Sequence, residues 1–333
     1  MMTNNTLLPL LTGRDQSGAS RARIETLTQE MGTGRVADAG RALSSDFSAL
    51  SQISHALRTT EARAASLNNA AIWLDVMQGS MERIEQAGAQ IGEKLVSTLT
   101  ASGYLSVDNL AVTAEGAMED IASALGRTHD GRGVFTNGDP AGPSPVDIDA
   151  LSADTKALAA GATDIASLLA AFDGYFADGG AFETNALRAF SAEPVQFPTG
   201  GGESIGVPVS AGDRSVRDAL KEAALVAALP DLGFPVGNAE LSELAAILPA
   251  RAATTLSNLT TSRAVIGTVE ERVDHARQNL DEERSKLETR KSDTIGADPY
   301  DTATRLQNEM TRLETLYAIT ARKSRLRLTD YLR

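Results

Sequence analysis

Carboxylates are the most numerous residues in this sequence whose chemistry could support catalysis or metal binding. They occur side by side at Glu270 and Glu271, and again at Asp281, Glu282 and Glu283. Paired carboxylates can serve as a general acid and base or hold a divalent cation. Successive residues of a helix point about 100° apart, however, so these side chains do not converge on one site. They indicate a solvated helix face.

The three histidines, His55, His129 and His275, have no metal-ligand spacing. His55 and His275 lie on polar faces of predicted helices and are interpreted as solvated side chains. The triple glycine 200–202 lacks the following Gly-Lys-Ser/Thr of a phosphate-binding loop, and it is typical of a hairpin turn. No motif of a hydrolase, a zinc protease or a dinucleotide-binding fold occurs. The sequence therefore predicts a non-enzymatic protein without catalytic, cofactor-binding or metal-binding residues.

A basic cluster near the C-terminus could suggest contact with nucleic acid. Arg322, Lys323, Arg325 and Arg327 alternate with leucines there. The net charge of the chain is −13, which argues against binding a polyanion. Cations are favoured at the C-terminal end of a helix, so the cluster is interpreted as helix-end stabilisation and subunit contact. No nucleic-acid partner is expected.

Composition favours thin helical packing over a thick globular core. Apolar residues make up 42% of the 333 residues, but aromatic residues only 4%. Cysteine is absent, which excludes disulfides and thiolate metal sites. The apolar run at 7–11 is short, is interrupted by Pro9 and follows no basic segment, so no cleaved signal peptide is predicted. No stretch approaches the roughly 18–20 apolar residues of a membrane span, and no membrane partner is expected.

Proline marks the organisation of the chain. Nine of the eleven prolines lie between Pro140 and Pro249, and none lies between Gly13 and Asp139. Proline costs about 3 kcal/mol inside a helix, so its absence permits long helices. The fold class predicted is mainly α: a long antiparallel, coiled-coil-like helical rod formed by the N- and C-terminal arms, with a small α+β insert between them.

Each arm carries an apolar stripe with a mean period near 3.5 residues, as in a coiled-coil seam. The first stripe runs from Leu43 to Leu95, a helix of about 80 Å at 1.5 Å per residue. A shorter helix is expected before it, ending at 32–34. The C-terminal stripe breaks at 295–300, around Gly296 and Pro299, and a final helix follows. Neither arm can bury its stripe alone, so the two arms are expected to pair.

The middle of the chain differs in pattern. Residues 131–140 indicate a turn, a short strand and a second turn. An alanine-rich helix is expected over 151–173, and β-type runs on both sides of 200–202 predict a hairpin. Asp213 or Ser215 could cap a helix that runs to about Leu229.

Three segments resemble the bacterial flagellin-like superfamily. Residues 24–36, with Thr33-Gly34-Arg35, resemble its opening of a helix, an (S/T)-G-(K/R) turn and a long helix. Gly131-Arg132-Gly133-Val134-Phe135 is similar to the N-G-R-x-x-F-x-G hairpin of these proteins, and residues 313–333 are similar to their terminal helix. Together the resemblance covers roughly 21–136 and 240–333.

Within the superfamily, the sequence looks most like the hook-associated proteins that join hook to filament, in their alphaproteobacterial form. Residues 37–43, Ala-Asp-Ala-Gly-Arg-Ala-Leu, depart from the N-S-A-x-D-D-A-A-G segment expected of flagellin itself. The resemblance implies an extracellular protein of the bacterial flagellum, exported by the flagellar type III apparatus without signal cleavage. It also implies self-association in a ring, and contacts with a hook-side hook-associated protein, flagellin and an export chaperone.

The expected divisions are 1–42 for an export and axial segment, 43–139 for rod helices with the hairpin, 140–249 for the insert, 250–295 for a C-terminal rod helix and 296–333 for an axial helix. The residues predicted to form helix-packing and subunit interfaces are Leu50, Leu57, Leu67, Leu74, Met81, Ile84, Ile266, Val273, Leu280, Leu313, Leu316, Ile319, Leu326 and Leu328. Flagellin, a filament subunit, is the alternative function, and a coiled-coil signalling or binding protein is a third.

Overall fold

In the computed structural model the chain is mainly helical, with two small hairpins, as the sequence predicted. The structure describes residues 8–38, 47–101, 105–140, 142–189, 191, 193–200 and 202–331, except for the side chains of 8–14, 98–101, 105, 106, 200, 238 and 323–331. The chain divides into two compact units. Residues 1–61 and 281–333 form the terminal unit, and residues 62–280 form the central unit.

The helices are α1 (Leu8–Thr33), α3 (Ser48–Ala101), α4 (Leu105–Leu125), α5 (Ile148–Gly161), α6 (Ile165–Tyr175), α7 (Ala181–Asn185), α8 (Arg214–Ala227), α9 (Asn238–Ile295) and α10 (Pro299–Tyr331), with a 3₁₀ turn at Leu229–Asp231. The strands are β1 (Thr128–His129), β2 (Arg132–Gly133), β3 (Gln196–Gly200) and β4 (Glu203–Gly206). Among the described residues, no helix is both long and apolar enough to cross a bilayer.

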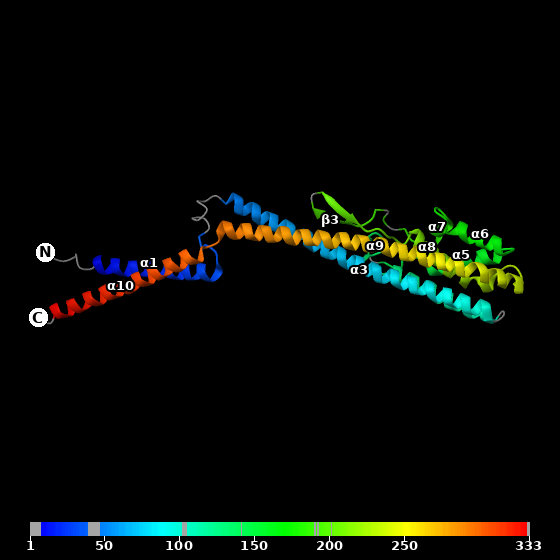
Figure 1. Cartoon of the computed structure of the whole chain (residues 1–333), viewed down its shortest axis with the longest axis horizontal. Helices are drawn as coiled ribbons and strands as arrows, with labels where there is room; N and C mark the ends of the chain where they lie inside the picture. The colour runs from blue at the N-terminus through cyan, green and yellow to red at the C-terminus, as the bar shows by residue number, and fades with distance from the viewer. Residues whose placement is uncertain are drawn as a thin grey trace. The chain divides into compact units, whose positions relative to one another are not determined.

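In the central unit, α3 and α9 run antiparallel and side by side (Figure 1). Gln78 Nε2 donates to the carbonyl oxygen of Arg263 at 3.0 Å, and Arg263 Nη1 lies 2.6 Å from Glu85 Oε2. Further along, a Cβ at Gly88 would lie 3.5 Å from the side chain of Leu256. The expected pairing of the two arms is therefore present in this unit. Small residues and polar ties set its register.

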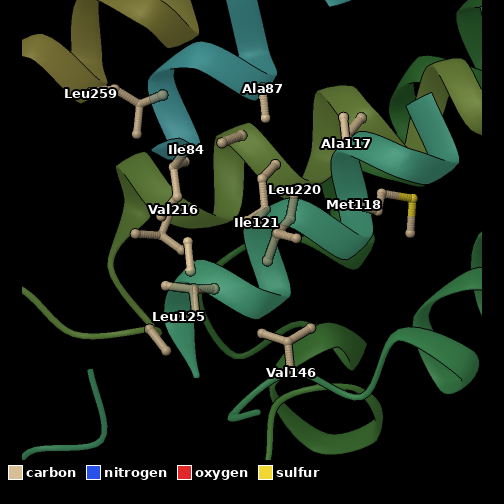
Figure 2. Close-up of a cluster of buried hydrophobic side chains, with 14 of the residues drawn as sticks. Ile84, Ala87, Ala117, Met118, Ile121, Leu125, Val146, Val216, Leu220 and Leu259 are labelled. Carbon is tan, nitrogen blue, oxygen red and sulfur yellow. The ribbon is translucent and has the colours of Figure 1, made fainter. Parts of the chain in front are cut away.

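The core of the central unit needs more than this pair. Side chains from α3, α4, α8 and α9 meet in one cluster, including Ile84, Ile121, Leu220 and Leu259 (Figure 2). Helix α8 is buried along nearly its whole length, even at Arg217 and Glu222. Burial at about 25 cal/mol per Å² of apolar surface makes this cluster the main stabilising element of the unit.

A network of charges fastens α6, α8 and α9 together. Arg251 donates to Glu222 at 3.0 Å and to Asp173 at 2.9 Å. The hydrogen bond from Arg251 lowers the pKa of Asp173, whereas burial raises the pKa of Glu222. Burial alone would lower the pKa of Arg251, but its bonds and charge pairing with Asp173 and Glu222 raise it. Such a network is stable only while every buried charge keeps its partner.

Two hairpins cover one part of the central unit. Strand β1 pairs with β2 through Asp130 and Gly131, whose φ angles of 52° and 72° suit a tight hairpin turn. Asn137 and Gly138 form the second expected turn, with φ of 53° and 80°. The strand predicted within 131–135 is thus confirmed, although it contains only Arg132 and Gly133. The hairpin predicted around 200–202 is also present, as β3 and β4.

Two boundaries differ from those expected. The single helix predicted over 151–173 is two helices, because Asp164 begins α6 with a capping box to Ser167. The rod helix expected from residue 250 begins at Asn238 and includes Pro249. Leu248 and Ala252 are buried beside this proline. Packing there offsets the roughly 3 kcal/mol that proline costs in a helix interior. The helix start expected near Leu43 lies outside the described residues.

Candidate helix-packing interface

In the terminal unit the segment that follows α1 is hydrogen-bonded to the segment that follows α9. Helix α1 ends before Gly34, whose φ of 65° favours glycine, and α9 ends before Gly296. The amide of Val36 donates to the carbonyl of Ile295 at 3.0 Å, and that of Ala297 donates to the carbonyl of Gly34 at 3.0 Å. Both breaks were expected from the sequence. The structure adds that they are hydrogen-bonded to each other, which sets α1 against α10.

Helices α1 and α10 then run antiparallel in contact (Figure 1). Half-buried apolar residues line this contact, and we call them the terminal seam: Ile24, Leu27, Leu306, Leu313 and Leu316. Among the described side chains of the two helices, only Ser20 and Thr302 are buried. Two helices form a single layer, and a single layer cannot close around an apolar core. The terminal seam is therefore open to further packing.

Polar contacts fix the register of α1 on α10. Arg21 Nε donates to the hydroxyl of Tyr317 at 2.8 Å, and the guanidinium lies 5.6 Å from the centre of that ring. Arg23 pairs with Glu309 at 3.2 Å. The second carboxylate oxygen of Glu309 is buried without a hydrogen-bond partner. These ties contribute little stability at exposed positions, but they disfavour other registers.

The predicted interface residues fall into two groups. Those in the central unit are buried within the chain: Leu67, Leu74, Met81, Ile84, Ile266, Val273 and Leu280. Leu57, in the terminal unit, is also buried, at 9% exposure. Leu50, Leu313 and Leu316 are half-buried, and Ile319 is 57% exposed. The side chains of Leu326 and Leu328 lie outside the described residues.

Other exposed apolar residues of the terminal unit were not predicted as interface. Met31 is 53% exposed, Met310 51% and Tyr317 43%. Met310 and Tyr317 lie seven residues apart, two turns along one helix face. They flank the stripe of the terminal seam. The apolar stripe of α10 is wider than contact with one partner helix requires, and this width is the sequence signal that could have identified them.

The residues first considered for chemistry do not come together. His55 and His275 are exposed, and His275 lies 3.7 Å from Glu271 on the same helix. His129 Nε2 lies 2.6 Å from Asn69 Oδ1 and packs edge-on against Trp73. In the part of the chain that the structure describes, no three His, Cys, Asp or Glu residues are placed to hold a metal ion.

Comparison with known proteins matches the C-terminal arm. Residues 251–332 match the family described as the bacterial flagellin C-terminal helical region. The crystal structure of Bacillus cereus FlgL is similar in fold, with a TM-score of 0.49 and 11% identity, over 71% of this chain and 96% of that one. No curated protein matches the sequence. The similarity to flagellin-like proteins that was expected of the C-terminal arm is confirmed over residues 251–332.

Proposed function

We propose that this chain is a structural subunit of the bacterial flagellum, outside the cell, and that it has no enzymatic activity. The observation that carries the proposal is the flagellin C-terminal match, which covers the whole described part of α10. That helix is also the one whose apolar seam stays half open in the single chain. A surface of this kind is completed by packing against other subunits.

The finer proposal is that the chain joins the hook to the filament as a ring of hook-associated subunits. Its support is the sequence at 37–43, which departs from the segment expected of flagellin. The partners proposed are further copies of the chain, a hook-side hook-associated protein, flagellin and an export chaperone. Export through the flagellar type III apparatus without a cleaved signal belongs to the same proposal.

Deletion of the gene tests both levels. A junction protein predicts cells that keep their hooks but release filament protein into the medium. Bare hooks without released filament protein would instead favour the flagellin alternative. Intact filaments and normal swimming would contradict the flagellar proposal altogether. Seeded polymerisation gives a second distinction, because purified flagellin extends filaments whereas a junction protein alone does not.

A substitution in the terminal seam tests the interface. Leu316→Asp places a charge on a half-buried apolar position, and the charge would be desolvated on assembly. We expect loss of incorporation, with unchanged fluorescence from Trp73, the single tryptophan, in the central unit. Thr315→Asp, at the exposed neighbouring position, is the matched control and is expected to assemble. Normal incorporation of Leu316→Asp would contradict the proposed interface.

A further inference from the structure

A small apolar groove lies in the central unit, where α4 and α9 begin. Its apolar lining comes from Val107 on α4, Leu229 in the 3₁₀ turn, Leu232 and Val236 in the following loop, and Leu241 and Leu244 on α9. The hollow measures about 40 Å³. That space suits the end of one aliphatic side chain. Leu232, Val236 and Leu241 are only half-buried, so the groove is accessible from solvent.

The rim of the groove is acidic. Asp108 lines it directly, and two further exposed carboxylates are next in sequence to lining residues: Asp231 precedes Leu232, and Glu243 precedes Leu244. Val112 follows Asp108 by one helical turn and is 67% exposed, which extends the apolar surface beyond the groove. No lysine or arginine is among the lining residues. The hydrogen bond to Glu115 and, to a smaller extent, the nearby charge of Asp231 raise the pKa of Lys156, but the ammonium of this lysine is already paired with Glu115 at 3.0 Å.

Charge is unevenly distributed along the chain. Residues 62–280 contain 28 acidic and 14 basic residues, so the central unit alone carries a net charge of −14. The segment 319–333 has the opposite composition. It holds five basic residues and one acidic residue, interleaved with the leucines Leu326, Leu328 and Leu332. An apolar hollow with an acidic rim is complementary to a segment of this kind.

We propose that this groove receives the basic C-terminal segment, residues 319–333, of a second copy of the chain, with a leucine in the hollow and arginines on the acidic rim. The contact joins two different surfaces, so it is heterologous and repeats from copy to copy. It rests on the proposed function only in requiring that copies of the chain assemble. The attraction is between exposed charges and weakens as salt screens them.

Directed cross-linking of two purified full-length copies tests the contact, because the natural chain has no cysteine. One copy carries Ser324→Cys, is reacted with excess bismaleimide and is freed of unreacted reagent. The second copy carries Val112→Cys at the groove. The matched control carries Val265→Cys, which is 45% exposed. Residue 265 lies about 30 Å along α9 from Leu244, at 1.5 Å per residue.

We expect at least fivefold more cross-linked dimer with Val112→Cys than with Val265→Cys, and a several-fold decrease in 1 M NaCl. Adding Asp108→Lys to the Val112→Cys copy should reduce the yield similarly. A labelled peptide of residues 313–333 should bind the full chain, and its Leu326→Ser, Leu328→Ser version should bind at least fivefold more weakly. Equal cross-linking at both positions, no cross-linking, or indifference to salt and to Asp108→Lys would overturn the proposal. These experiments use purified protein and the deletion experiment uses cells. The groove contact can therefore be contradicted while the proposed function is supported, and the proposed function can be contradicted while the groove contact is supported.

Discussion

The two units use the same kind of apolar stripe with opposite results. In the central unit the stripes of α3 and α9 share one cluster with side chains of α4 and α8, and Leu67, Ile84 and Leu220 in this cluster are fully buried. In the terminal unit α1 packs against α10, and Leu313 and Leu316 of this contact stay half-buried. The comparison teaches that a stripe specifies a packing face, whereas the number of layers decides whether the face closes.

The two units also differ in net charge. The terminal unit contains 17 basic and 16 acidic residues and is close to neutral, whereas the central unit is strongly acidic. Central units of neighbouring copies therefore repel, and near-neutral terminal units do not. Apolar packing between terminal units should gain from added salt, because screening reduces the repulsion between central units, whereas the contact proposed for residues 319–333 should weaken. The predictions below test the contrast between the units, beginning with the largest effect.

Removing a leucine should be costly in the central unit and cheap in the terminal unit. Leu220→Ala empties a fully buried position on α8, and we expect the free energy of unfolding to fall by about 2–5 kcal/mol. Leu313→Ala, its match on α10, should cost less than about 1 kcal/mol. Trp73, which is 3% exposed, reports unfolding of the central unit in urea. Hydrogen exchange of the α10 amides reports the terminal unit. Equal losses would contradict the contrast.

Removing Arg251 should destabilise the central unit by about 2–4 kcal/mol at pH 7, because Glu222 is left as a buried, unpaired carboxylate. Burial already raises the pKa of Glu222, and loss of Arg251 raises it further, so this carboxylate takes up a proton as pH falls. The loss should therefore be smaller at pH 5 than at pH 7 in urea unfolding followed through Trp73. Arg277→Ala, which removes an exposed pair with Asp274, should change stability by less than about 0.5 kcal/mol. A cost for Arg251→Ala that is independent of pH would argue against this account.

Two glycines of the terminal unit should respond in opposite directions. Gly34→Ala forces a side chain into a left-handed conformation and should destabilise the connection by about 1 kcal/mol, although space is open around it. Gly18→Ala lies inside α1, also in open space, and should stabilise that helix by about 0.5–1 kcal/mol. Hydrogen exchange over residues 15–38 measures both. A loss of stability with Gly18→Ala would indicate that another contact covers this face of α1.

The smallest effect is expected at Glu85, which ties α3 to α9 in the central unit. The hydrogen bond from Arg263 is the main cause of its lowered pKa. A carboxyl group with a folded-state pKa below the unfolded value stabilises the fold above the unfolded pKa, and this contribution is lost as pH falls through the folded pKa. Glu85→Gln should therefore cost about 0.5–1 kcal/mol at pH 7 and almost nothing well below pH 4. Urea unfolding at several pH values tests this, and a constant difference would contradict it.

Local signals in the sequence predicted the helices and turns well. The glycine at 34, the interruption at 295–299 and the turns at 130–131 and 137–138 act through backbone geometry, which short-range residue types determine. The break between α5 and α6 had a readable signal as well, since Asp164 and Ser167 have capping-box spacing. The alanine-rich composition on both sides concealed it.

Long-range packing could not be read in the same way. Most of the residues predicted as helix-packing and subunit interfaces are buried inside the chain. They share one cluster with residues of α4 and α8, and nothing in the stripe of α3 reveals those partners. Pro249 was taken as a boundary, but the contacts of Arg251 and Leu248 hold the helix through it. The terminal seam could likewise be predicted from the sequence as an apolar face, but how far its residues stay exposed could not.

The pairing of α1 with α10 also has a temporal consequence. Arg21 and Tyr317 are 296 residues apart in sequence. At about 5–20 residues per second, a ribosome needs roughly 15–60 s between making the first of these residues and making the second. During that interval α1 has no partner within its own chain, while the central helices between them can already begin to fold. Closing so long a loop also adds an entropic cost that local helix contacts do not have. The terminal unit is therefore the part of the protein that matures last during synthesis.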